Sequence, residues 1–247
     1  MRTTFLVKLF LGATLYVIPY FVVAQTQFGI KGGVNMSNIG YNPSGTTHPE
    51  QKTSFHAGVI FDIPVRPSKM MVIAPEVLAS IKGANYQLIE TEGYNVKRNF
   101  SLVYISIPVS IKYQKAEKTG PVFGLGPYVS FLAGVRDKQT FKFSTLDSLG
   151  VLLSSADSTH IETGTEDYNT IDFGFHFTLG IKFKMGLFLS ARYEIGVSNI
   201  VKETTIEKDD PSSGLPTSTT QQAYGRNTNL QFSIGWMFGG GKKSNYY

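Results

Sequence analysis

The sequence has no cysteine, few charged residues and, beyond its first 24 positions, no long apolar run. Without cysteine it can form no disulfide, no thiol nucleophile, no thiolate metal site and no lipid-modified N-terminal cysteine. Charged residues make up only 17% of the chain, and no basic run accompanies the net charge of +5, so nothing indicates nucleic-acid binding. After Ala24 no stretch reaches the roughly 18 apolar residues that mark a transmembrane helix.

The residues that are abundant favour strands. The 247 residues include 25 glycines, and 13% of the chain is aromatic. Aromatic residues prefer strands, and glycine serves turns and places where backbones approach closely. At this length the chain forms one or two domains. Composition and length therefore favour strands and turns over a helical bundle.

The first 24 residues have the parts of a secretory signal peptide. Arg2 and Lys8 supply a short positive region, residues 9–23 are apolar, and Ala24 closes a small-residue cleavage site before Gln25. The alternative is a retained transmembrane helix, which the short apolar length and the strand pattern that follows directly disfavour. We therefore predict an exported protein that is cleaved between Ala24 and Gln25.

Eight segments of the mature chain alternate apolar with polar residues, with the period of two that is typical of strands. They are Gln27 to Met36, Ser54 to Ile63, Met70 to Lys82, Asn99 to Tyr113, Gly120 to Gly134, Asp172 to Phe183, Leu187 to Val197 and Thr228 to Phe238. We predict one barrel domain over residues 25–238, followed by a flexible tail over residues 239–247.

The two faces of these segments differ in kind. One face is uniformly large and apolar, as at Phe173, Phe175 and Phe177, whereas the other combines charged residues with many glycines. In a soluble sandwich or a lipocalin-like barrel the apolar face would lie inside, but it has almost no small residues that would let such an interior pack. A bilayer inverts the rule, with apolar residues outward and polar residues inward. The pattern therefore predicts a transmembrane β-barrel.

The connections between the segments alternate strictly between long and short. The short ones are Pro64 to Lys69, Gln114 to Thr119 and Met185-Gly186; the long ones are Ser37 to Thr53, Gly83 to Arg98, Val135 to Asn169 and Ser198 to Asn227. Short periplasmic turns and long outer loops are typical of outer-membrane barrels. We therefore expect both termini in the periplasm and four exposed loops as the working surface.

The ordered series of segments resembles the PorT-like outer-membrane β-barrel family, which is common in Bacteroidota. The resemblance covers essentially the whole mature chain apart from its loops, and it is carried by "QFGIKGGVNMSNI", "FHAGVIFDIPV", "APEVLASIKGANY", "LVYISIPVSIKY", "GPVFGLGPYVSFL", "FGFHFTLGIKFKMGLFLSARYEIGVSNI" and "NLQFSIGWMF". It implies an all-β fold, an eight-stranded antiparallel up-and-down transmembrane barrel of OmpA- or OmpX-like architecture. It implies little about activity, because members share no catalytic motif. One subgroup takes part in secretion, and no residue here places the chain in it.

The polar face predicts a charged lumen. An eight-stranded barrel is filled by side chains, and charges inside it need partners. We predict a structural lumenal network of Asp62, Glu76, Lys82, Lys112, His176, Arg192 and Glu194. A path for protons or small solutes through these residues is the alternative. His56 and His176 share this face, but their spacing enforces no metal site.

Aromatic residues near strand ends fit the belts that barrels place at membrane–water interfaces. The candidates are Tyr86, Tyr104, Tyr113, Tyr128, Tyr168, Tyr193 and Trp236. We expect them to serve as anchors in the interface.

These observations predict a monomeric, non-catalytic protein of the outer membrane with a structural or interaction role. One form of that role is as an accessory subunit of a secretion or uptake complex. We expect no catalytic residue, cofactor or metal, and as partners outer-membrane lipids, including lipopolysaccharide, and a protein of the outer membrane or periplasm. One alternative is solute transport through the lumen. Another is a lipid A-modifying enzyme that uses His160, although the chain has no nucleophile elbow or ordered triad.

Overall fold

The structure, a computed structural model, describes residues 26–41, 49–65, 70–91, 94–114, 119–146, 152–166, 168–202, 204–209, 216–221 and 225–238. The predicted signal peptide, its cleavage site at Ala24 and Gln25, and the tail over residues 239–247 lie outside these ranges. The described part of the chain contains no helix long and apolar enough to span a membrane.

Eleven strands lie in the described ranges. They are β1 (Gln27–Tyr41), β2 (Pro49–Pro64), β3 (Met71–Thr91), β4 (Tyr94–Gln114), β5 (Gly120–Leu146), β6 (Leu152–Glu162), β7 (Ile171–Lys182), β8 (Leu187–Gly196), β9 (Thr204–Asp209), β10 (Pro216–Gln221) and β11 (Gly225–Phe238).

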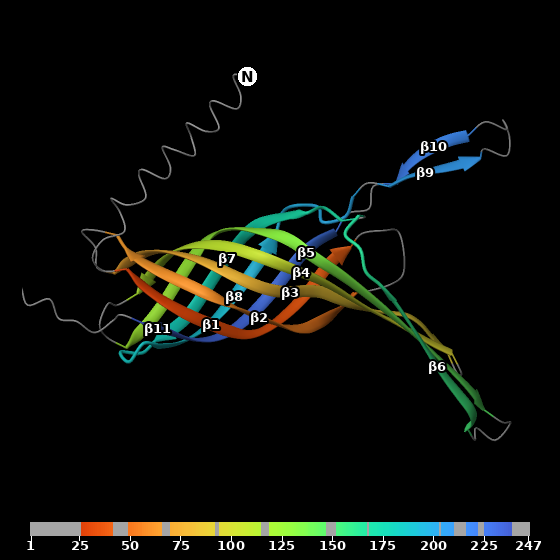
Figure 1. The fold of residues 1–247 in the computed structure, drawn as a ribbon, viewed down its shortest axis with the longest axis horizontal. Helices are drawn as coiled ribbons and strands as arrows, with labels where there is room; N and C mark the ends of the chain where they lie inside the picture. The colour runs from red at the N-terminus through yellow and green to blue at the C-terminus, as the bar shows by residue number, and fades with distance from the viewer. Residues whose placement is uncertain are drawn as a thin grey trace, which may run out of the picture.

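Eight of these strands close into a barrel. The antiparallel order is β4-β3-β2-β1-β11-β8-β7-β5, and the pairing of β4 with β5 completes the ring. The first and last strands lie side by side, with Phe28 opposite Phe238 (Figure 1). A closed ring leaves no unpaired strand edge within the barrel, which a bilayer requires because lipid offers no hydrogen bonds to the backbone. The prediction of an eight-stranded barrel is confirmed.

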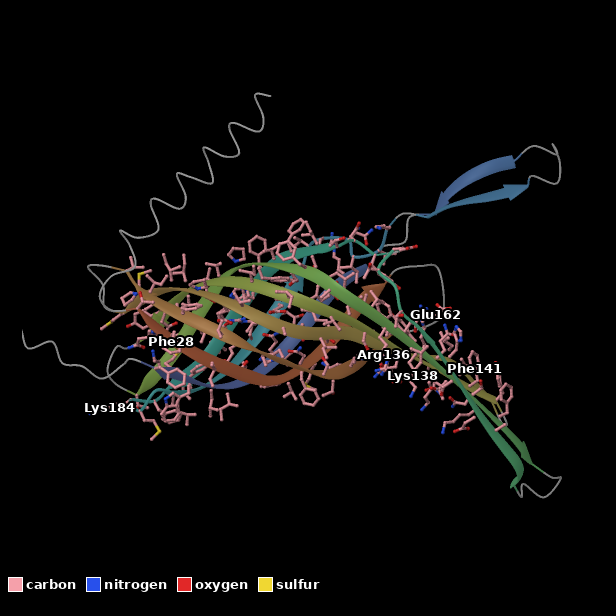
Figure 2. All side chains as sticks on the ribbon, viewed as in Figure 1. Phe28, Arg136, Lys138, Phe141, Glu162 and Lys184 are labelled. Atoms are coloured by element: carbon pink, nitrogen blue, oxygen red, sulfur yellow. The ribbon has the colours of Figure 1, made fainter. Side chains whose placement is uncertain are left out.

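The two faces of each barrel strand point where the alternation predicts. On β7, Phe175 and Phe177 are exposed on the outside, whereas His176 and Thr178 are buried inside. The rest of the exterior has the same character, with exposed Phe28, Ile30, Phe55, Phe123, Leu125 and Ile234, among others (Figure 2). The large apolar side chains therefore form the lipid-facing surface, and the polar side chains fill the lumen.

Short connections gather at one end of the barrel, which we call the short-turn end. Here Phe183 accepts a hydrogen bond from the Gly186 amide at 3.0 Å and also donates its own amide to Leu187, which closes a tight turn between β7 and β8. Gly186 has φ of +100°, a conformation that side chains with a Cβ rarely adopt. Glycine at this position is therefore required by the turn.

At the opposite end, which we call the long-hairpin end, the structure has strands in much of the chain that was predicted to form loops. Residues 83–98 are almost entirely strand, because β3 runs to Thr91 and β4 begins at Tyr94. Within 135–169, β5 continues to Leu146 and pairs with β6; within 198–227 lies the separate β9–β10 hairpin. A strand that has left the bilayer no longer needs an apolar outer face, so the alternation that marks the membrane part ends before the strand does.

The extended strands form a sheet that projects beyond the barrel. We call it the outer sheet and define it as residues 84–91 of β3, 94–100 of β4, 136–146 of β5 and 152–162 of β6. These segments pair in that order, from Ala84 opposite Phe100 to Asp137 opposite Glu162 (Figure 1). Its β6 edge has no neighbouring strand within the described ranges. The outer sheet is thus a platform outside the membrane, continuous with the barrel wall.

Candidate functional site

The lumen holds the candidate site. The structure places all seven predicted network residues inside the barrel, where Asp62, Glu76, Lys82, Lys112, His176, Arg192 and Glu194 are each buried. Charged side chains are rarely buried unless they are paired, so the arrangement of their partners decides what the lumen can do.

Glu76 is the centre of the first cluster, which lies toward the short-turn end. Its carboxylate contacts Lys31 Nζ at 2.7 Å, Arg192 Nη2 at 2.5 Å and Lys112 Nζ at 3.5 Å. Lys31 is absent from the predicted network, although it lies on the polar face of β1 and the alternation placed it there. Three cations therefore surround one buried acid, contributed by β1, β8 and β4 around the ring.

Asp62 extends this cluster to the rim of the barrel. It accepts hydrogen bonds from Gln114 Nε2 at 2.9 Å and Lys182 Nζ at 3.2 Å, and Lys112 Nζ lies 3.7 Å away. Lys182 also donates to Gln27 Oε1 at 2.9 Å, which ties β7 to the first residue of β1. We call Lys31, Asp62, Glu76, Lys112, Lys182 and Arg192 the positive group, because its four cations outnumber its two acids.

A second cluster lies deeper, toward the long-hairpin end, and reverses this balance. Lys82 Nζ is 3.0 Å from Glu194 and 3.8 Å from Asp172. Asp172 also accepts hydrogen bonds from Ser198 Oγ at 2.6 Å and Asn227 Nδ2 at 3.0 Å. We call Lys82, Asp172 and Glu194 the negative group, since one cation serves two acids.

Two tyrosines that the sequence placed in the interface belong to this second cluster. Tyr104 and Tyr128 are buried in the lumen, and their ring centroids lie 5.6 and 4.6 Å from Lys82 Nζ. The assignment of these two residues to the aromatic belt was therefore wrong. The signal was present in the sequence: Val103 and Val129 fall on the apolar face of their segments, and a residue next to them in a strand points inward.

Neutral residues lie between the two groups on β3 and β7, whereas on β8 Arg192 and Glu194 are successive lumenal residues. Along β3, Ser80 lies between Glu76 and Lys82, and along β7 His176 lies between Thr178 and Asp172. His176 Nε2 is 2.8 Å from Ser110 Oγ.

The other lumenal histidine, His56, has partners of the same kind. Its ring contacts Asn35 Oδ1 at 2.7 Å and Ser233 Oγ at 2.8 Å. Both lumenal histidines are thus held by neutral polar partners. No cluster of three or more potential metal ligands occurs among the described residues.

The long-hairpin end of the lumen is closed by apolar side chains. Ile39, Ala84, Phe100, Leu102, Tyr104, Leu132, Val135 and Ile200 form one buried cluster, which we call the apolar plug. Ile200 reaches it from the segment after β8, which hydrogen bonds to Gly225 at the start of β11 and to Asn169 just before β7 and so continues the wall between them. Sequence analysis missed the plug because it assigned Ile200 to an exposed loop.

The short-turn end keeps a small cavity. It is lined by the whole positive group and by an apolar wall that includes Ile60, Phe188 and Met237. The centres of water molecules can occupy ≈ 30 Å³ of it. That is room for about two waters, far less than a solute pathway needs.

Comparisons with known proteins found a matching family model and similar solved structures. The family model described as "Outer membrane protein beta-barrel domain" matches residues 23–202. The solved structure of Ail, the attachment invasion locus protein of Yersinia pestis, is similar at 10% identity and TM-score 0.36, over 87% of this chain and 100% of that one. OprG from Pseudomonas aeruginosa is similar at 12% identity and TM-score 0.35, over 87% and 96%. No curated protein matches the sequence.

Proposed function

Because the chain belongs to the outer membrane protein beta-barrel domain family and lies in the outer membrane, we propose that it is a non-catalytic, non-conducting barrel that binds a partner through its outer sheet. In such barrels the short turns face the periplasm and the long connections face outward. The long-hairpin end is then extracellular. The observation that carries the proposal is the outer sheet itself, a wall of four paired strands that continues past the membrane.

The outer sheet presents a row of cations just beyond the lipid-facing band. Lys97, Arg136 and Lys138 are exposed and share one face, since Arg136 pairs with Ser101 and Lys138 with Asn99 on β4. We call these three residues the cation row. Figure 2 labels Arg136 and Lys138 where the sheet leaves the barrel. None of the three has an acidic partner among the described ion pairs, whereas nearby Arg98 is bound to Asp137 at 2.5 Å.

The position of the cation row favours the phosphates of lipopolysaccharide as its partner. Along β5, Arg136 lies five residues beyond the exposed, lipid-facing Phe131, or about 17 Å of strand. That distance reaches from the apolar band into the zone of charged headgroups. A Lys or Arg near an anionic lipid surface contributes about 1 kcal/mol. Three such cations would give a useful, salt-sensitive attraction.

The proposal is tested by titrating the barrel in neutral detergent with lipopolysaccharide and measuring the temperature at which it unfolds. Lipopolysaccharide should raise this temperature for the wild type. Replacing Lys97, Arg136 and Lys138 by Gln together should weaken apparent binding roughly 100-fold. Lys184→Gln is the matched control, because Lys184 is exposed at the opposite end of the barrel (Figure 2). Two outcomes contradict the proposal. One is a triple variant that binds like the wild type, and the other is a wild type that binds dephosphorylated lipopolysaccharide as tightly as the phosphorylated form.

The apolar plug supports the absence of conductance. Its residues pack apolar side chains together at the outer end of the lumen, and the cavity at the other end is small. Reconstituted protein should therefore give no ion current in planar bilayers. Steady single-channel steps from the wild type would favour the transport alternative instead.

The lipid A-modifying alternative finds little support at His160. Its side chain is 63% exposed, and its Nε2 contacts Glu162 at 3.1 Å, on the far strand of the outer sheet. A catalytic base needs a nucleophile within hydrogen-bond reach and a site that excludes water. We expect lipid A of the same mass with and without the protein, as measured by mass spectrometry of extracted lipid.

The finer family assignment is part of the proposal. The resemblance to the PorT-like branch, and with it an origin in Bacteroidota, rests on the ordered strand sequences. Export through the leader over residues 1–24 rests on its charged, apolar and small-residue parts. N-terminal sequencing of the protein from outer membranes should begin at Gln25, and any other start would move the cleavage site.

A further inference from the structure

We propose that the positive group binds a small monovalent inorganic anion of the size of chloride in the cavity at the short-turn end of the lumen. The inference does not depend on the proposed function, because it concerns the opposite end of the barrel. It rests on a charge imbalance, on one unpartnered guanidinium nitrogen and on the size of the cavity.

The charge imbalance is local and buried. Lys31, Lys112, Lys182 and Arg192 line the cavity together with only two acids, Asp62 and Glu76. Three of the cations converge on Glu76, which carries a single negative charge. The cavity wall therefore carries two excess positive charges, which Glu194, the next lumenal residue to Arg192 on β8, offsets only in part. A charge held away from bulk water needs a partner of opposite sign, and a bound anion supplies one.

Arg192, which lines the cavity, has one donor group without a partner. Its Nε donates to Thr178 Oγ1 at 3.1 Å and its Nη2 binds Glu76 at 2.5 Å, but its buried Nη1 has no hydrogen-bond partner. A guanidinium cannot lose its proton to relieve this, and buried donors are almost always satisfied in proteins. An anion beside Nη1 would satisfy the donor and reduce the excess charge together.

The size and walls of the cavity restrict what can fill it. Its ≈ 30 Å³ of space for water centres admits a halide and a water, but no bulky organic acid. Ile60, Phe188 and Met237 close one side with apolar atoms, which lowers the local dielectric and strengthens attraction between ions. Asp62 Oδ1 also lacks a hydrogen-bond partner, so the water belongs beside Asp62 and the anion beside Arg192.

The negative group serves as an internal contrast. There one cation, Lys82, faces Asp172 and Glu194, so an anion would be repelled. Of the two groups, only the positive group therefore combines excess positive charge with a cavity beside it. An anion can enter past Lys182, the group's most exposed cation at the rim.

The test compares chloride with gluconate at constant sodium concentration and ionic strength. The full barrel, folded in neutral detergent, is heated and its unfolding temperature is measured. Chloride should raise this temperature by about 3 °C once the site is filled, whereas gluconate is too large to enter. The line width of the ³⁵Cl resonance should also increase in the presence of the protein, which reports binding directly.

Three variants decide the location of the site. Lys112→Gln and Lys182→Gln should each lose most of the chloride-dependent shift and of the ³⁵Cl broadening, whereas exposed Lys184→Gln should keep both. Should Lys112→Gln fail to fold, Lys182→Gln at the rim remains decisive. Equal stability of the wild type in chloride and gluconate overturns the proposal and leaves the cavity to water. An unchanged chloride effect in a folded Lys112→Gln or Lys182→Gln variant overturns it as well.

Discussion

The two ends of the lumen are closed by opposite chemistry. At the short-turn end, ion pairs around Glu76 and Asp62 surround a small cavity. At the long-hairpin end, Phe100, Leu132 and Ile200 pack into the apolar plug. Ion pairs are directional and fail when one partner is removed, whereas apolar packing tolerates exchange between groups of similar volume. We therefore expect the first end to be intolerant of substitution and the second to be forgiving.

The largest effect should come from breaking the positive group at its centre. Glu76→Gln leaves Lys31, Arg192 and Lys112 without their shared acid, which should lower the free energy of unfolding by about 3–5 kcal/mol. Urea unfolding of the folded barrel in detergent measures the change. Glu162→Gln is the control, since that carboxylate is 69% exposed and should change stability little. Equal stability of the two variants would mean that Glu76 is not the centre of the cluster.

The apolar plug should respond to volume and tolerate shape. Ile200→Ala removes buried methylene and methyl groups at the mouth and should cost about 2 kcal/mol. Ile200→Leu keeps the volume and should cost less than about 1.5 kcal/mol. Urea unfolding compares the two, and planar-bilayer recordings show whether the smaller side chain lets ions pass. A Leu variant as unstable as the Ala variant would show that this end is as exacting as the other.

Glycines in the barrel wall sharpen the same contrast. A Cβ added to Gly126, on the lumenal face beside the charged region, would lie 1.9 Å from the carbonyl oxygen of Val109 on β4. Gly126→Ala must push two strands apart and should cost about 1–3 kcal/mol. A Cβ on Gly134, further along the same strand toward the plug, meets nothing within 4 Å. Gly134→Ala should therefore leave the unfolding temperature almost unchanged, and a similar loss in both variants would remove the distinction.

The barrel could be predicted from the sequence because the bilayer constrains it. Every strand inside the membrane needs apolar residues outside and a paired backbone, so alternation such as that around His176 reveals both the strand and its faces. The same parity identifies the lumenal charges. Position alone also identifies Lys31 and Tyr128 as lumenal, since each lies next to a residue of the lipid-facing side.

The outer sheet and the apolar plug could not be predicted in the same way. Beyond the membrane β4 and β5 have no lipid-facing side, and Tyr94 to Arg98 hold a single buried apolar residue, Val96, which is too little to separate a strand from a loop. Ile200 packs against Phe100 and Leu132, which lie on other strands, and no local pattern encodes such a contact. The pairing of Lys82 with Glu194 likewise depends on a register that only the closed ring fixes.

The smallest effect concerns the aromatic wall around Lys82. Tyr128 Oη lies 3.5 Å from Asp172, a long hydrogen bond, so Tyr128→Phe should lower the free energy of unfolding by only about 0.5 kcal/mol. The ring that faces Lys82 Nζ at 4.6 Å stays in place in this variant. Tyr128→Leu removes the ring as well and should cost about 1 kcal/mol more, because a desolvated ammonium is attracted to an aromatic face. Equal losses of unfolding free energy in the two variants, measured by urea unfolding, would assign Tyr128 to the apolar packing of the plug rather than to the negative group. The boundary between the plug and the charged part of the lumen would then lie one layer of side chains closer to the short-turn end.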